Sequence, residues 1–119
     1  MPFQYILANL LAETGASGIL FLDELGETVD VACSDYTPYD MKILGAYFGI
    51  YMRQLTQFLT ATGVGRPALI YVEKERVHIY SRVLPDDYYL VLVQKRPALV
   101  GKTRVALDKA AKQLRQEVF

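Results

Sequence analysis

Hydrophobic positions change their spacing several times along the chain, and each change predicts a new helix or strand. Spacing of three and four residues predicts three helices, at residues 2–13, 38–62 and 101–118. Short apolar or alternating runs between turn residues predict five strands, at residues 19–22, 28–33, 68–72, 77–82 and 88–94. The predicted order is therefore helix, two strands, helix, three strands, helix.

Two of the predicted strands, 19–22 and 88–94, are apolar at successive positions, so both faces of the sheet must be covered. The long central helix can cover one face if the two terminal helices share the other. Short turns between consecutive strands make the sheet mostly antiparallel. The predicted fold class is α+β, a three-layer α/β/α sandwich with a five-stranded, mostly antiparallel sheet, formed by residues 1–119 as a single domain.

The central helix contains ten consecutive uncharged residues, 43–52, which is half the length needed to span a bilayer. At about 100° per residue, one broad face is expected to rest on the sheet, formed by Met41, Leu44, Phe48, Tyr51, Met52, Leu55, Phe58 and Leu59. Ile43, Tyr47 and Ile50 lie on a flank of that face, with Ala46 further out. This surplus of apolar surface predicts a second protein surface against the helix.

Gly45 and Gly49 lie on the other flank of the same helix. Each costs about 1 kcal/mol relative to alanine in a helix interior, so a packing gain should offset the cost. Two explanations remain open: the glycines let the helix lie close to its own sheet, or they let a second helix approach.

The net charge of the 119 residues is zero, but the charges are unevenly distributed. The first 40 residues carry seven acidic residues and no Lys or Arg, whereas residues 95–119 carry seven basic residues and two acidic ones. The domain lacks the overall basic surplus of a nucleic-acid-binding protein. Two poles of opposite sign fit steering of a protein partner or head-to-tail contacts, although a solvated basic helix face would look the same.

Few residues suggest chemistry. His78 has no carboxylate among its strand neighbours and is expected to be a hydrogen-bonded sheet histidine. Cys33 is expected to be a small structural residue near acidic neighbours, and Asp86 and Asp87 are expected to form a turn. Gly101-Lys102-Thr103 lacks the upstream glycine of a phosphate-binding loop and is expected to start a helix.

These observations predict a protein that is not an enzyme and has no cofactor and no metal site. One cysteine and one histidine cannot supply a structural zinc site. The N-terminus lacks the basic region of a signal peptide, so a cytoplasmic protein without a membrane span is expected.

The element order, together with several short segments, resembles the Roadblock/dynein light-chain superfamily, in particular its bacterial MglB-like members. The segments are Gly15-Ala16-Ser17-Gly18, the turn from Asp23 to Gly26, the glycine-containing central helix, and Pro97-Ala98-Leu99-Val100-Gly101. The resemblance covers nearly the whole chain and implies the roadblock/profilin-like arrangement of the sandwich. The family has no catalytic signature of its own.

The resemblance implies a homodimer, or a heterodimer with a similar domain, in which central helices pair antiparallel and third strands join across a two-fold axis. The residues that it places at the dimer interface are Ile43, Gly45, Ala46, Tyr47, Gly49, Ile50, Leu69, Ile70 and Tyr71. Joining the third strands would also cover an apolar sheet edge, which otherwise invites aggregation.

The family's usual partners are Ras-like small GTPases or larger assemblies, so the first functional hypothesis is a dimeric, non-catalytic module that binds and regulates a Ras-like small GTPase, by activation or as a scaffold. A structural adaptor that pairs with a related domain in a larger complex is the alternative. A small-molecule sensor with a pocket between sheet and helix is the third hypothesis.

Overall fold

The structure is a computed structural model that describes residues 2–65, 67–95 and 99–118. Its elements are α1 (Pro2–Thr14), β1 (Gly18–Leu22), β2 (Thr28–Cys33), α2 (Pro38–Ala61), β3 (Leu69–Glu73), β4 (Val77–Val83), the 3-10 turn η1 (Pro85–Asp87), β5 (Tyr89–Lys95) and α3 (Val100–Val118). The predicted order is confirmed, and every helix and strand boundary agrees with its expected position to within one residue.

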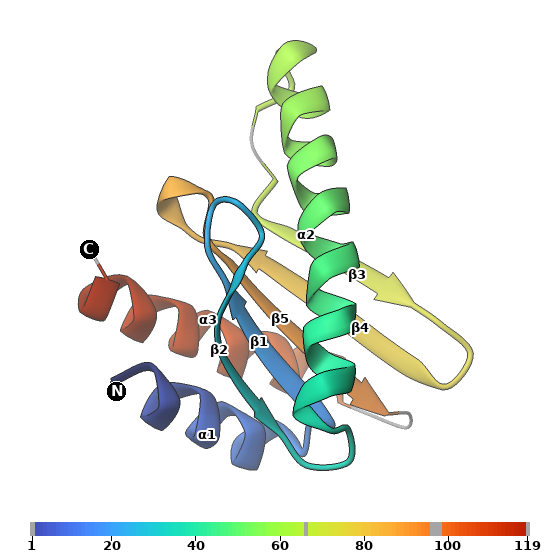
Figure 1. Cartoon of the computed structure of the whole chain (residues 1–119), viewed down its shortest axis with the longest axis vertical. Helices are drawn as coiled ribbons and strands as arrows, with labels where there is room; N and C mark the ends of the chain where they lie inside the picture. Colours follow the sequence, from blue (N-terminus) through green and yellow to red (C-terminus); the bar gives the residue numbers. More distant parts are fainter. Residues whose placement is uncertain (1, 66, 96–98, 119) are drawn as a thin grey trace.

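The five strands form one sheet in the order β2-β1-β5-β4-β3, and every neighbouring pair is antiparallel. The sheet was expected to be mostly antiparallel and is entirely so. The N-terminal hairpin β1–β2 is joined to the C-terminal strands through the β1–β5 pair, in which Leu20 lies opposite Val91. The two outer strands of the sheet are β2 and β3 (Figure 1).

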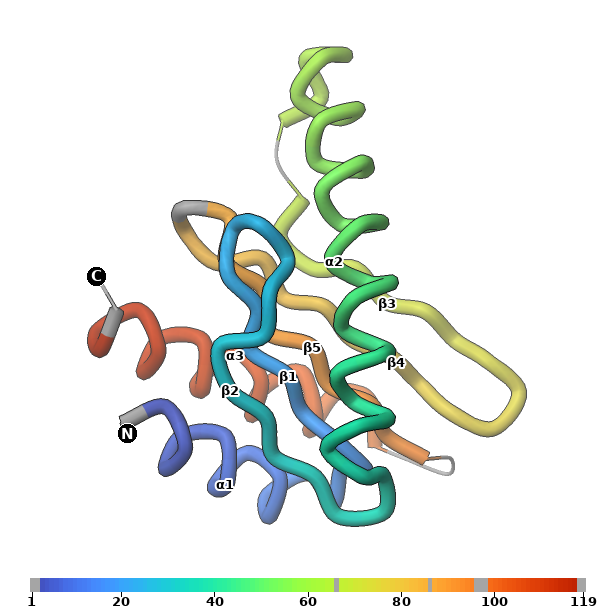
Figure 2. Tube along the Cα trace, viewed as in Figure 1, coloured from blue at the N-terminus to red at the C-terminus, as the bar shows by residue number. Residues whose placement is uncertain are grey.

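The helices form the two outer layers, as the burial of the strands requires. Helices α1 and α3 pack side by side on one face of the sheet, and α2 crosses the other face (Figures 1 and 2). All five residues of β1 are buried, as are the first six of β5, because their side chains alternate between the two layers. The predicted three-layer sandwich is confirmed.

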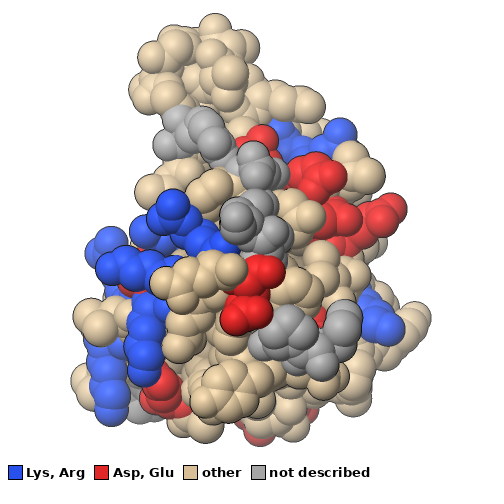
Figure 3. Space-filling view, turned by 90° about the vertical axis from the view of Figure 1, so that its left-hand side faces the viewer, with Lys and Arg blue, Asp and Glu red and all other residues tan. Residues whose placement is uncertain are grey.

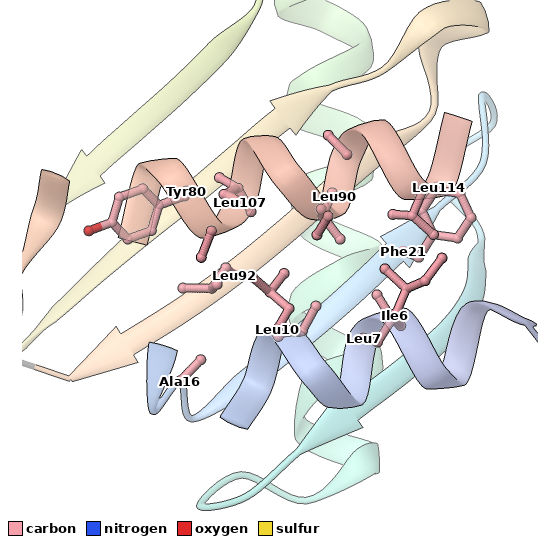
Figure 4. Close-up of a cluster of buried hydrophobic side chains, with 14 of the residues drawn as sticks. Ile6, Leu7, Leu10, Ala16, Phe21, Tyr80, Leu90, Leu92, Leu107 and Leu114 are labelled. Atoms are coloured by element: carbon pink, nitrogen blue, oxygen red, sulfur yellow. The ribbon is translucent and has the colours of Figure 1, made fainter. Parts of the chain in front are cut away.

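Two hydrophobic clusters hold these layers together. Figure 4 shows the first, in which side chains of α1 and α3 meet Phe21, Leu90 and Leu92 from the sheet. The second lies beneath α2 and combines Met41 and Met52 with side chains from the opposite face of the strands. The alternation of strand residues between the clusters makes the sheet the common wall of both.

Helix α2 begins at a capping box. The Thr37 side chain accepts a hydrogen bond from the Asp40 amide, and the Asp40 carboxylate accepts one from the Thr37 amide. Pro38 occupies the first turn, where its missing N–H costs no helical hydrogen bond. The helix ends before Gly63, whose φ of +73° suits glycine.

The closest approach of α2 to the rest of the chain is at the β1–β2 turn. A Cβ atom placed on Gly49 would lie 2.8 Å from the Cα and carbonyl oxygen of Gly26, and one placed on Gly45 would lie 3.0 Å from the Leu20 side chain. Gly26 itself has a φ of +81°, in the left-handed region that favours glycine. Backbone therefore packs on backbone here, which explains why the helix carries glycines in its interior.

A buried polar network ties α1, β4, β5 and α3 together. Gln94 is buried, and both the oxygen and the nitrogen of its side-chain amide form hydrogen bonds. Tyr80 Oη and Thr103 Oγ1 donate to the oxygen, and Nε2 donates to the Thr14 carbonyl oxygen. Such a network stabilises the fold only while each member keeps its partners.

Replacing Gly49 with alanine should destabilise the protein by about 1–3 kcal/mol, because the new methyl group would collide with the Gly26 backbone. Urea unfolding followed by circular dichroism measures the change. Gly101→Ala is the matched control, since a Cβ there meets no atom within 4 Å. Equal stability of the two variants would contradict the close packing of α2 on the β1–β2 turn.

Replacing Gln94 with leucine should lower the free energy of unfolding by about 2 kcal/mol, because Thr103, Tyr80 and the Thr14 carbonyl would lose a buried partner. Thermal and urea unfolding measure this loss. The same substitution at the exposed Gln116 should change stability by less than about 0.5 kcal/mol. A Gln94→Leu variant as stable as the wild type would show that the network contributes nothing to the fold.

Candidate protein-interaction surface

One flank of α2 exposes a row of large apolar side chains, which is interrupted by the exposed Gln54. Ile43, Tyr47 and Ile50 are exposed there, and Ile50 leaves 54% of its surface accessible. Tyr51 and Phe58 extend the row and are 57% and 62% exposed. At 100° per residue these five side chains fall within an arc of about 100°, so they form one stripe along the helix.

The expectation that Tyr51 and Phe58 rest on the sheet was wrong. With 24 residues, α2 is about 36 Å long, and its C-terminal end projects beyond the sheet (Figure 1). Phe58 lies on these projecting turns. Tyr51 does not, because Thr56, which is further along the helix, is still buried. The buried face runs through Gly45, Gly49 and Thr56, about 120° around the axis from Tyr51, so the face that the helical wheel placed on the sheet was wrong in direction.

Gly45 and Gly49 were assigned to the dimer interface, and the structure instead buries both within the monomer. Gly45 faces the side chains of Leu20 and Leu22, and Gly49 faces the backbone of Gly26. Of the two explanations that the sequence left open, the structure supports close packing of the helix on its own sheet. Ala46 is exposed but lies on the side of the helix that carries Lys42 and Arg53.

The apolar stripe borders a part of the sheet that α2 leaves open. Helix α2 lies over β1 and β2. On the same face, β3 and β4 contribute half-buried side chains to the second cluster, next to Leu44 and Phe48 of the helix; these are Ile70, Val72, Val77 and Val83. The helix flank and the β3–β4 half of this sheet face thus form one apolar surface.

The three interface candidates on β3 do not all face this surface. Ile70 does, whereas Leu69 packs against the cluster beneath α1 and α3. Tyr71 also points to that opposite face, where its ring lies 5.1 Å from the ring of Tyr80. The β3 backbone still forms an outer edge of the sheet, so pairing with another strand would involve all three residues.

The residues considered for chemistry do not come together. His78 is buried at 4% exposure, and its Nε2 lies 4.0 Å from a Glu73 carboxylate oxygen. Neither ring nitrogen has a hydrogen-bond partner in the described part of the chain, contrary to the expectation of a hydrogen-bonded histidine. Cys33 packs at the second cluster, and no group of three potential metal ligands occurs within residues 2–65, 67–95 and 99–118.

The remaining candidates belong to local structure. Lys102 and Thr103 lie in the first turn of α3, as expected for a helix start, and Thr103 is engaged by Gln94. Asp87 lies in η1 with a φ of +62°. Pro97 and Ala98, which belong to one of the family-like segments, lie outside the described residues.

A surface groove of about 410 Å³ lies beside the buried Gln94 network, between the end of α1 and the start of α3. Thr14, Gln94 and Thr103 line it, and they bind one another. Burial raises the pKa of the neighbouring Tyr80 phenol, and the nearby Tyr71 phenol raises it further. The network's polar groups are satisfied by the protein itself, so the groove gives no support to a small-molecule sensor.

Lys95, at the edge of the same groove, pairs with Asp35 at 3.1 Å. Its hydrogen bond and positive charge hold the pKa of the Asp35 carboxyl below its usual value.

None of the described helices is long and apolar enough to cross a membrane. The apolar surface along α2 and β3–β4 is therefore the main candidate for function.

No protein-family model and no curated protein matches this chain by sequence. Solved structures do match. MglB of Myxococcus xanthus is similar with a TM-score of 0.87 and 15% identity, over 96% of this chain and 92% of that one. An MglB with a tetrameric arrangement has a TM-score of 0.85 and 22% identity, over 97% and 88% of the two chains.

A Roadblock/LC7 domain from Streptomyces avermitilis is also similar, with a TM-score of 0.83 and 13% identity, over 96% of this chain and 95% of that one. These likenesses cover nearly the entire length on both sides, although fewer than a quarter of the aligned residues are identical. The expected resemblance is thus confirmed at the level of the fold. The chain therefore has the same fold as these MglB and Roadblock/LC7-domain structures.

Proposed function

We propose that this protein is a non-catalytic interaction module that acts as a dimer, formed through the exposed flank of α2 and the outer edge of β3. The observation that carries the proposal is the apolar row from Ile43 to Phe58, which continues onto the half-buried side chains of β3 and β4. A row of this length on a surface helix is typical of a protein interface.

The free energies of burial and association favour an interface that uses both the α2 flank and the β3 edge. Burying the exposed half of a large apolar side chain contributes about 1 kcal/mol, so the five residues of the row in two copies contribute about 10 kcal/mol. Association costs about 4–15 kcal/mol in lost freedom of motion. The helix row alone roughly offsets that cost, so a stable dimer needs the β3 edge as well. The family arrangement, with paired helices and joined third strands, uses both.

The proposed partner of this dimer is a Ras-like small GTPase, as the resemblance to MglB-like proteins implies. The described residues bring together no catalytic group of their own, which fits a protein that positions another protein's residues or holds it in place. The alternative is an adaptor that pairs with a related domain. The exposed row supports either, since a similar domain would present a similar helix flank.

Replacing Ile50 with aspartate should split the dimer, because the proposed interface would bury a carboxylate with no counter-ion. We expect the dimer dissociation constant to rise at least ~100-fold, which corresponds to about 3 kcal/mol. Sedimentation equilibrium measures it. Thr60→Asp adds the same charge on the side of the helix that carries Lys42 and Arg53 and should leave the dimer intact. A wild-type protein that is monomeric at about 50 µM would refute the dimer proposal.

A Ras-like small GTPase encoded beside this protein should bind the dimer. The wild-type dimer should change the rate at which that GTPase exchanges nucleotide or hydrolyses GTP. The Ile50→Asp variant should lose the effect, and Thr60→Asp should keep it. Binding without any change in either rate would indicate a scaffold. A mixed dimer with a co-expressed related domain, without binding to any such GTPase, would favour the adaptor.

A further inference from the structure

A second surface, remote from the apolar row in the layered fold, has the chemistry of a docking groove. It is a groove of about 340 Å³ between α3 and the end of β4, and four of its lining residues are charged: Arg82, Asp108, Lys112 and Arg115. Figure 3 shows Lys and Arg side chains gathered at the left of this face of the molecule. The groove therefore belongs to the basic pole that the sequence indicates.

The charges of the groove are only partly balanced. Asp108 pairs with Arg82, with 3.4 Å between carboxylate oxygen and guanidinium nitrogen. Lys112 and Arg115 are exposed and form no ion pair with any residue of the described ranges. The remaining lining side chains are apolar, contributed by Val83, Leu84, Pro85 and Ala111. A ligand for this groove should combine negative charges with an apolar side chain.

The β1–β2 turn of the same protein has that complementary chemistry. Glu24 and Glu27 are exposed, and neither forms an ion pair among the described residues. Between them, Leu25 is 57% exposed. The turn is also held rigidly: one carboxylate oxygen of Asp23 accepts hydrogen bonds from the amides of Leu25 and Glu27, both at 2.9 Å.

Rigidity matters because an ordered turn loses little conformational entropy when it binds. The contact between Gly26 and Gly49 presses this turn against α2 and fixes its direction. The zero net charge of the chain leaves no overall repulsion between copies, so local complementarity can act.

We propose that the α3 groove of one copy receives the β1–β2 turn of a second copy, with Glu24 and Glu27 facing Lys112 and Arg115 and Leu25 against the apolar wall. Such a contact joins two different surfaces and is therefore head-to-tail, so it can extend from copy to copy. It uses none of the residues of the apolar row on α2 or of the β3 edge. The proposed dimer and this contact could thus operate together to link dimers into larger assemblies.

The contact is tested by sedimentation of the full chain at two ionic strengths. Exposed charge pairs are screened more strongly as salt increases, so the association constant should fall at least ~10-fold between about 20 mM and 300 mM NaCl. The reversals K112E/R115E and E24K/E27K should each abolish the salt-sensitive association, since both create like charges across the contact. Circular dichroism confirms that the variants are folded.

A charge swap then separates this contact from a general effect of net charge. A chain carrying all four reversals, and an equimolar mixture of the two double variants, should both regain the salt-sensitive association. K42E/K102E changes the net charge by the same amount as K112E/R115E, at residues outside the groove, and should behave like the wild type. The Ile50→Asp variant should retain the association, so failure of this contact and failure of the dimer are distinguishable.

The proposal would be overturned if the average molecular mass of the wild type in sedimentation did not change with salt concentration. It would also be overturned if the four-reversal variant associated no better than the two double variants. In that case the groove would be left for an acidic segment of a different protein.

Discussion

The backbone contact between α2 and the β1–β2 turn determines which part of the sheet α2 covers, and the exposed surface of the protein follows from that position. Because Gly49 meets Gly26 without any intervening side chain, α2 is drawn over the β1–β2 half of the sheet. A helix held there leaves the side chains of Ile70, Val72, Val77 and Val83 on β3 and β4 only half-buried. The apolar flank of the helix and the open half of the sheet are two consequences of the same constraint.

This asymmetry gives a physical reason for the exposed apolar surface along α2. The other face of the sheet is covered by α1 and α3, whose side chains pack on it in the first cluster (Figure 4). The two proposed contacts use different residues: the apolar row and β3 in one, the α3 groove and the tip of the β1–β2 turn in the other.

Much of the fold could be predicted from the sequence because its signals are local. Apolar runs in β1 and β5 require cover on both faces, and short turns between strands permit only antiparallel neighbours. The stripe of Ile43, Tyr47 and Ile50 was also located correctly, because a helix turns by a constant angle per residue.

The sequence by itself determined the order of elements, the antiparallel sheet and the presence of an excess apolar flank, since each depends on the periodicity of neighbouring residues. Only the tertiary structure decided that Gly45 and Gly49 face the protein's own sheet, that Tyr51 and Phe58 are exposed, and that His78 is buried without a hydrogen bond among the described residues. These features depend on which side of a helix rests on the sheet and on which distant backbone it touches, and no local spacing of side chains encodes either.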